Sequence, residues 1–149
     1  MTTSYTPGLY ARAAGPGSEP VAGVTEARIR ELVGEFYRRA QEDVVLGPIF
    51  AEHIDDWDRH LGRMVDFWSA VMRGTGRYQG RPVQVHQGID GLTGGHFDRW
   101  VTLFEATTRD VCSPAEAEAF LERARRMREA MTRSLGLVGP KARLDSERS

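Results

Sequence analysis

Cysteine and lysine are almost absent from this sequence of 149 residues, which contains only Cys112 and Lys141 of these two types. A single cysteine excludes an internal disulfide bond and a zinc site built from several cysteine ligands. It fits a reducing compartment, so we expect a cytoplasmic location. The other basic residues are arginines and the formal net charge is −1. This balance disfavours binding to nucleic acid or to an anionic membrane surface through a general positive field.

Long apolar runs are also missing, and this absence bears on the organisation of the chain. No stretch approaches the roughly 18–20 apolar residues that span a bilayer. Residues 1–23 mix Gly, Pro, Ser and Thr and lack the apolar core of a signal peptide. We therefore expect a flexible N-terminal arm at 1–23, one folded domain at 24–138 and a flexible charged tail at 139–149.

Several common catalytic motifs cannot be found. The sequence has no phosphate-binding loop ending in Gly-Lys-Ser/Thr, no Gly-x-Gly-x-x-Gly turn after a strand and no Gly-x-Ser-x-Gly elbow. The four histidines are His53, His60, His86 and His96, and no two of them are four residues apart as in a helical zinc site. These absences exclude the common nucleotide-binding, serine hydrolase and zinc hydrolase classes.

Apolar residues recur at helical spacing in four segments, which predicts an all-α fold. The first helix follows Thr25 as its N-cap and ends before a turn within 43–50, because Pro48 disfavours helical geometry at Gly47. The second helix begins after Asp55 or Asp56 and ends at the first of two glycines, at 74 and 76.

The remaining two helices are separated from the second by a long loop. Residues 77–95 contain five glycines and a proline, with room for one helical turn that begins at Pro82. An aromatic-rich helix follows the loop. The last helix starts with a capping box of Ser113 and Glu116 and stops at Gly136. Loops of this length usually have a function or a bound group to order them.

One loop histidine and four side chains on the helices suggest a prosthetic group. His86 would face Tyr37, His60, Trp68 and Trp100. A haem iron needs one neutral imidazole as a fixed ligand, an apolar slot for the macrocycle and a few donors on the other face. A histidine on an apolar stripe is more often a hydrogen-bonded core residue than a ligand, so the residues alone leave both interpretations open.

The order and spacing of these residues resemble those of the group III truncated haemoglobins, which are two-over-two globins. The resemblance covers roughly residues 24–138. It depends on six motifs in order: Phe36-Tyr37, Asp43-x-x-Leu46-Gly47-Pro48-Ile49-Phe50, Trp57-x-x-His60, Phe67-Trp68, Tyr78-x-Gly80-x-Pro82-x-x-x-His86 and Phe97-x-x-Trp100-x-x-x-Phe104. It implies a truncated two-over-two globin fold, with a long loop that carries the proximal histidine.

The resemblance also implies a cofactor and a role for each site residue. The cofactor is haem b (iron protoporphyrin IX), and its iron would be five-coordinate with His86 as the proximal ligand. Tyr37, His60 and Trp100 would lie on the distal side and stabilise a bound diatomic gas such as O2, NO or CO. The residues expected to wall the macrocycle are Phe50, Met64, Phe67, Trp68, Tyr78 and Phe97. The propionates would need positive charge at the rim, for which Arg63, Arg77, Arg81 and Arg99 are equal candidates.

Three functions of different class remain open at this point. The first is reversible binding of a diatomic gas by a carrier, store or sensor. The second is a haem enzyme that uses O2 or peroxide, as a nitric oxide dioxygenase or a peroxidase-like enzyme, with electrons from an external reductase. The third is a haem-free helical interaction domain, which the presence of His86 disfavours. The oligomeric state is not set by the sequence.

Overall fold

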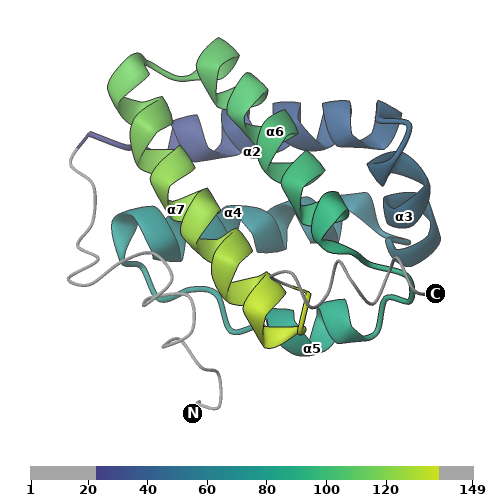
Figure 1. The fold of residues 1–149 in the computed structure, drawn as a ribbon. Helices are drawn as coiled ribbons and strands as arrows, with labels where there is room; N and C mark the ends of the chain where they lie inside the picture. Colours follow the sequence, from purple (N-terminus) through teal and green to yellow (C-terminus); the bar gives the residue numbers. More distant parts are fainter. Residues whose placement is uncertain (1–22, 138–149) are drawn as a thin grey trace.

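The computed structural model describes residues 23–137, and within this range all regular secondary structure is helical. The expected N-terminal arm, apart from Gly23, and the expected C-terminal tail lie outside the described residues. Figure 1 shows the helices in their order along the chain: α2 (Glu26–Glu42), α3 (Leu46–His53), α4 (Trp57–Arg73), α5 (Pro82–Gln87), α6 (Gly94–Val111) and α7 (Pro114–Ser134). The all-α prediction is confirmed. No helix in the described part is long and apolar enough to cross a membrane.

The long helices form two pairs that cross each other. Helix α2 packs against α4, and α6 packs against α7. The second pair lies across the first, as the two perpendicular views show, with α2 in contact with both α4 and α6. The fully buried side chains Phe36, Phe104 and Phe120 fill the space between the pairs. This is the two-over-two arrangement expected from the sequence.

Local capping signals explain where the helices begin and end. The hydroxyl of Thr25 accepts a hydrogen bond from an N–H in the first turn of α2, and Asp56 does the same for α4. Ser113 and Glu116 form the predicted reciprocal capping box of α7. Gly74 ends α4 in the left-handed conformation that glycine adopts without steric cost. These predicted boundaries are confirmed.

Helix α3 was not expected, and the prediction that Pro48 disfavours helical geometry at Gly47 is wrong. The two residues lie in the first turn of α3. A proline is tolerated there because the first N–H groups of a helix have no partner within the helix. Asp43 accepts hydrogen bonds from the N–H groups of Val45 and Leu46 and so supports this start. The turn itself is therefore shorter than expected, and a helix follows it.

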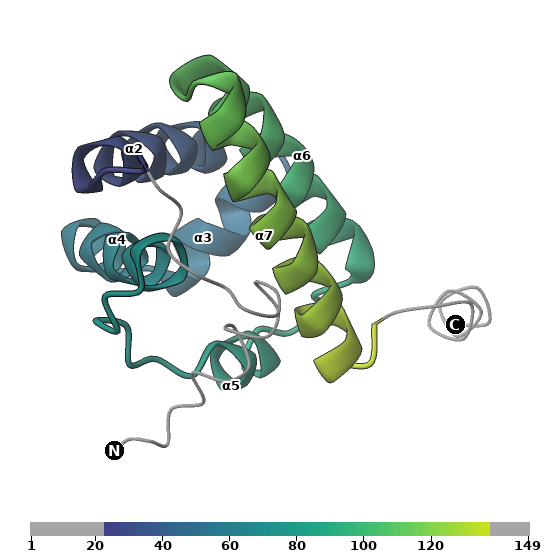
Figure 2. The same ribbon diagram turned by 90° about the vertical axis from the view of Figure 1, so that its left-hand side faces the viewer.

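The long loop contains the predicted single helical turn, now seen as α5. This helix has six residues, starts at Pro82 and contains no buried residue. In Figure 2 it lies away from the four long helices, and irregular segments join it to α4 and α6. The ion pairs of Arg77 with Glu26 and Asp66 attach the first of these segments to α2 and α4. The rest of the segment carries Tyr78, which is buried.

Candidate functional site

His86 lies near the end of α5 and is half-buried. Its Nδ1 is 2.7 Å from the carbonyl oxygen of Pro82. Because a carbonyl can only accept, Nδ1 must carry the proton, which leaves the lone pair on Nε2. The ring lies 5.7 Å from that of Phe97 at the start of α6. Burial lowers the pKa of His86, opposed in part by the Pro82 bond, so the imidazole is neutral with a free lone pair.

Tyr37 and His60 are brought into direct contact from two helices. Tyr37 comes from α2 and His60 from α4, and the two rings meet edge to face with centroids 5.0 Å apart. Burial raises the pKa of Tyr37 well above its usual range, so the hydroxyl keeps its proton. Burial and the nearby Arg63 lower the pKa of His60. The pair therefore presents a neutral phenol beside a neutral imidazole.

The Nε2 atom of His60 is buried and has no hydrogen-bond partner among residues 23–137. Leaving such an atom unpaired costs about 1–3 kcal/mol. Buried polar atoms in native proteins are nearly always paired, so an atom of this kind indicates a ligand or water that completes the site. The unpaired Nε2 thus favours binding of a small polar ligand next to Tyr37.

The ring contacts of Trp100 within the described residues are with other side chains than this pair. Its ring lies against Phe36, at 5.6 Å, and stacks on Phe104, at 5.1 Å. Phe104 in turn stacks on Trp68, at 5.0 Å, so three nearly parallel rings connect α6 with α4. Trp100 is half-buried. The structure therefore places it one ring away from Tyr37, with Phe36 between them.

The other expected wall residues lie in two places. Phe67 and Tyr78 are buried and in contact, with ring centroids 5.1 Å apart, and Phe67 also touches Trp68. Met64 is half-buried one turn beyond His60 and packs against the core. Phe50 lies next to Tyr37, with the two ring centroids 5.6 Å apart. These side chains supply an apolar lining on α3, α4 and the segment before α5.

Sequence reasoning missed Trp57 as a site residue. It is the first residue of α4 and its ring contacts those of Tyr37, Phe50 and His60. The available signal was the spacing Trp57-x-x-His60 on a helix that starts at Trp57, because residues three apart share a helix face.

The structure separates the four arginines that were equal candidates at the rim. Arg77 already pairs with two carboxylates, and Arg99 forms a bidentate pair with Asp43. Arg63 lies beside Tyr78, where it partly offsets the rise in the pKa of that phenol caused by burial. Arg63 and Arg81 are exposed and have no ion pair with a carboxylate of the described residues. These two are the better candidates for holding an acidic group.

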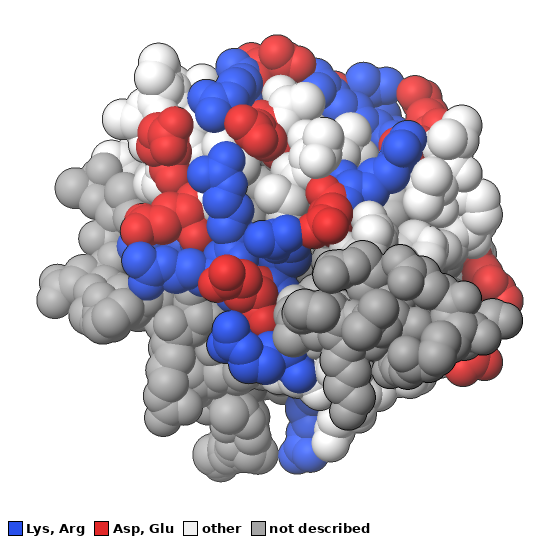
Figure 3. Space-filling model, in the orientation of Figure 1, with Lys and Arg blue, Asp and Glu red and all other residues white. Residues whose placement is uncertain are grey.

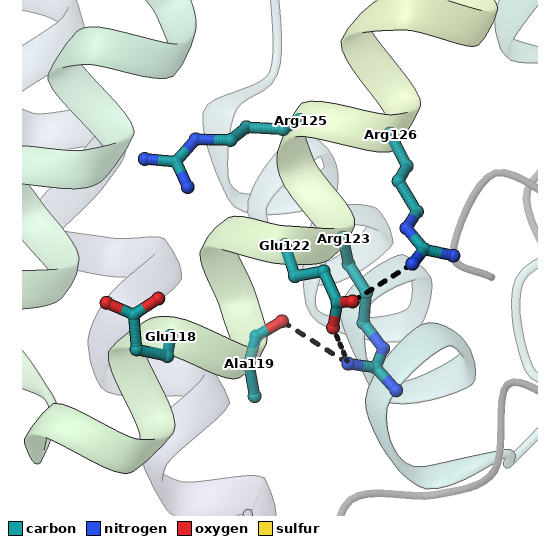
Figure 4. A pocket seen from close by; sticks show the side chains of 6 residues that line it. All are labelled: Glu118, Ala119, Glu122, Arg123, Arg125 and Arg126. Atoms are coloured by element: carbon teal, nitrogen blue, oxygen red, sulfur yellow. Dashed lines mark hydrogen bonds and ion pairs between the residues drawn. The ribbon is translucent and has the colours of Figure 1, made fainter.

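A hollow lies along α7, lined by residues between Glu118 and Arg126, none of which is a predicted site residue. Figure 4 shows that the arginines lining it are interleaved with glutamates. Arg126 pairs with Glu122 at 3.0 Å and Arg125 with Glu105 at 3.6 Å. Figure 3 shows the same mixture of charges on the face of the molecule turned to the viewer. The arginines of α7 therefore form no uniform basic surface on that face.

Comparisons with known proteins agree with this arrangement. The model of the family described as "Bacterial-like globin" matches residues 21–133. A curated relative, "Group 3 truncated hemoglobin ctb" of Campylobacter jejuni, is 29% identical over 105 residues, which cover 68% of this chain and 83% of the relative. The crystal structure of a group III truncated haemoglobin from Campylobacter jejuni matches with a TM-score of 0.72 and 26% identity, over 80% of this chain and 95% of that one.

The matched region contains all the helices described above, apart from the last residue of α7. It also contains His86 and the Tyr37–His60 pair. The chain therefore belongs to the bacterial-like globin family, which implies a haem cofactor and a diatomic gas as ligand.

Proposed function

We propose that the chain binds haem b through Nε2 of His86 and holds O2, NO or CO reversibly on the opposite face, beside Tyr37 and His60. The observation that carries the proposal is the half-buried neutral imidazole of His86, whose protonated Nδ1 is fixed by Pro82. A metal-bound histidine commonly donates its other ring N–H to a carbonyl, which fixes both the tautomer and the ring orientation. The haem iron, when bound, supplies the position at which the diatomic gas binds.

The distal side chains are suited to hold a polar diatomic ligand. Tyr37 keeps its proton and donates from a buried hydroxyl. His60 offers the buried Nε2, for which the described part of the chain provides no hydrogen-bond partner. In a pocket that excludes water, such donors stabilise negative charge on the ligand more strongly than they would in bulk solvent. Trp100, one ring further away, supplies an indole N–H as a third donor.

The proposed cofactor is held by apolar contact and by charge at its edge. The wall comprises Phe50, Met64, Phe67, Trp68, Tyr78 and Phe97, of which Phe67, Trp68 and Tyr78 are buried. Arg63 and Arg81, which form no ion pair with a carboxylate of the described residues, would bind the propionates. The lone cysteine favours a cytoplasmic location, which is part of this proposal.

The ligand assignment is tested by His86→Ala with His53→Ala as a matched control. His53 also donates from Nδ1 to a carbonyl four residues earlier, at 2.9 Å, but is exposed. We expect the Soret band of the purified haem-loaded protein to disappear or shift in His86→Ala and to stay unchanged in His53→Ala. An unchanged spectrum in His86→Ala would contradict the assignment.

The distal assignment is tested by the rate of O2 release. A charge-assisted hydrogen bond contributes about 1.5–3 kcal/mol, so Tyr37→Phe and Trp100→Phe should each speed O2 release about tenfold or more. Stopped-flow displacement of O2 by CO measures this rate. Unaltered rates in both variants would remove the distal donors from the proposal.

Gas binding and catalysis are separated by one further measurement. The O2-loaded protein is mixed with NO in the presence of a cellular reductant, and nitrate is counted per haem. A single turnover without regeneration supports reversible binding as the function. Sustained turnover would instead show a nitric oxide dioxygenase that works with an external reductase.

A further inference from the structure

Trp57 lies among the aromatic rings of the proposed distal side. Its indole lies 5.6 Å from the ring of His60, 5.9 Å from Tyr37 and 6.1 Å from Phe50. These neighbours come from three helices, α4, α2 and α3. The four rings, which we name the distal aromatic cluster, are connected through Trp57 and Tyr37.

Two rings of the cluster contact the imidazole of His60. Tyr37 meets this ring at an interplanar angle of 89°, and Trp57 meets it at 86°. Edge-to-face pairs have a preferred geometry, so the two contacts together restrict rotation of the imidazole. His60 and Trp57 are both half-buried, whereas Nε2 of His60 is fully covered. An imidazole that turned outward would have to break its contact with Trp57.

Trp57 is itself held firmly at the start of α4. The side chain of Asp56 accepts a hydrogen bond from the N–H of Arg59 and fixes the first turn. Trp57 is the first residue of that turn, and His60 follows it three positions later on the same face. The cap therefore fixes the stretch of backbone that carries both the indole and the imidazole.

We propose that Trp57 is a positioning residue of the distal pocket, which keeps the imidazole of His60 turned inward beside Tyr37 and so limits the entry of a diatomic gas. This inference rests on the proposed function, because it concerns the side of the pocket where the gas would bind. It assigns Trp57 no contact with the gas. Its effect passes through His60.

The test compares Trp57→Ala with the conservative Trp57→Phe in the CO-loaded protein. The infrared C–O stretch reports the polar surroundings of the gas, and flash photolysis reports the rate of CO association. In Trp57→Ala we expect the main C–O band to split or broaden, and association to become at least about threefold faster. Phenylalanine restores a ring in contact with His60, so Trp57→Phe should retain one main band and a rate within about twofold of the original.

Two controls separate positioning from general loss of stability. Leu121 is fully buried in α7 and outside the cluster, so Leu121→Ala should lower the melting temperature without changing the C–O band. In a His60→Leu background, the further change Trp57→Ala should leave the association rate within about twofold, because coupled residues do not act additively.

Each outcome bears on one claim only. An unchanged band and association rate in Trp57→Ala, with haem still bound, would overturn the positioning role and leave the proposed function intact. The same holds if Trp57→Ala speeds association equally with and without His60. Failure of the unaltered protein to bind haem would instead overturn the proposed function.

Discussion

Replacement of Asp43 by asparagine is expected to lower the free energy of unfolding by about 1–2 kcal/mol at pH 7. The carboxylate accepts bidentate hydrogen bonds from Arg99, both at 2.9 Å, and bonds from two N–H groups at the start of α3. Together these lower the pKa of Asp43 from its ordinary 3.8 to about 2, with the Arg99 bond as the largest cause.

The magnitude follows from linkage. A lowering of the pKa from 3.8 to about 2 corresponds to about 2 kcal/mol of stability. The Asp43 side chain is 11% exposed but that of Arg99 is 43% exposed, so solvent screening reduces this figure. Asparagine can still accept from the N–H groups of α3, which reduces the loss further. About 1–2 kcal/mol remains for the pair with Arg99.

The lowered pKa of Asp43 also sets the direction in which the free energy of unfolding changes with pH. Because the pKa is lower in the folded state, the stabilisation is fully present above about pH 4 and is lost as the pH falls towards 2. Urea unfolding at pH 7 and at several values between 2 and 4 measures both effects. The difference between Asp43→Asn and the original should vanish at the acid end, and Arg99→Gln should cost little more in the Asp43→Asn background. A difference independent of pH would refute the reasoning.

Three further outcomes are expected. Gly47→Ala should lower the free energy of unfolding by about 1–3 kcal/mol in urea titration, because a Cβ there would lie 2.6 Å from the carbonyl oxygen of Gln41. Gly80→Ala should weaken haem retention in transfer to apomyoglobin, because its Cβ would clash with the hydroxyl of the buried Tyr78 and displace that ring. Burial raises the pKa of the Cys112 thiol to about 11, so alkylation near pH 7.5 should be ~100-fold slower than for free cysteine.

The glycine predictions share one control. Gly34 lies in α2 with open space around its Cβ position, so Gly34→Ala should stabilise the protein by about 0.5–1 kcal/mol. Stabilisation by Gly47→Ala or unchanged haem transfer in Gly80→Ala would contradict the packing at that position. Rapid alkylation of Cys112 in the folded protein would contradict its burial.

The sequence predicts the four long helices because their signals are local. Thr25, Ser113 and Gly74 act on backbone groups within one turn, so their effect can be seen without knowledge of the rest of the chain. Helix α3 was missed because its start depends on more than local signals. The effect of Pro48 depends on whether the helix begins before or after it, and that start is set by Asp43, which Arg99 also binds from 56 residues away.

The candidate site was predicted less completely than the fold. Tyr37 and His60, both expected on the distal side, lie in contact, and their proposed roles remain predictions. The arginine candidates could not be ranked from the sequence, because the pairing of Arg77 with Glu26 joins residues 51 positions apart. Trp57 was missed because its spacing from His60 was used to identify the fold and not the pocket.

The sparse contacts of α5 with the rest of the fold, made by Val83 with the core and by His86 with Phe97, have a consequence for how the protein matures. A six-residue helix without a buried side chain has little stability of its own, since isolated helices below about 12–15 residues are marginal in water. If His86 anchors the prosthetic group, the group also anchors α5, so loading completes the tertiary structure. Cells short of iron or porphyrin would then accumulate chains with a frayed segment at 79–93, exposed to proteases, and the protein's abundance would follow the supply of its pigment.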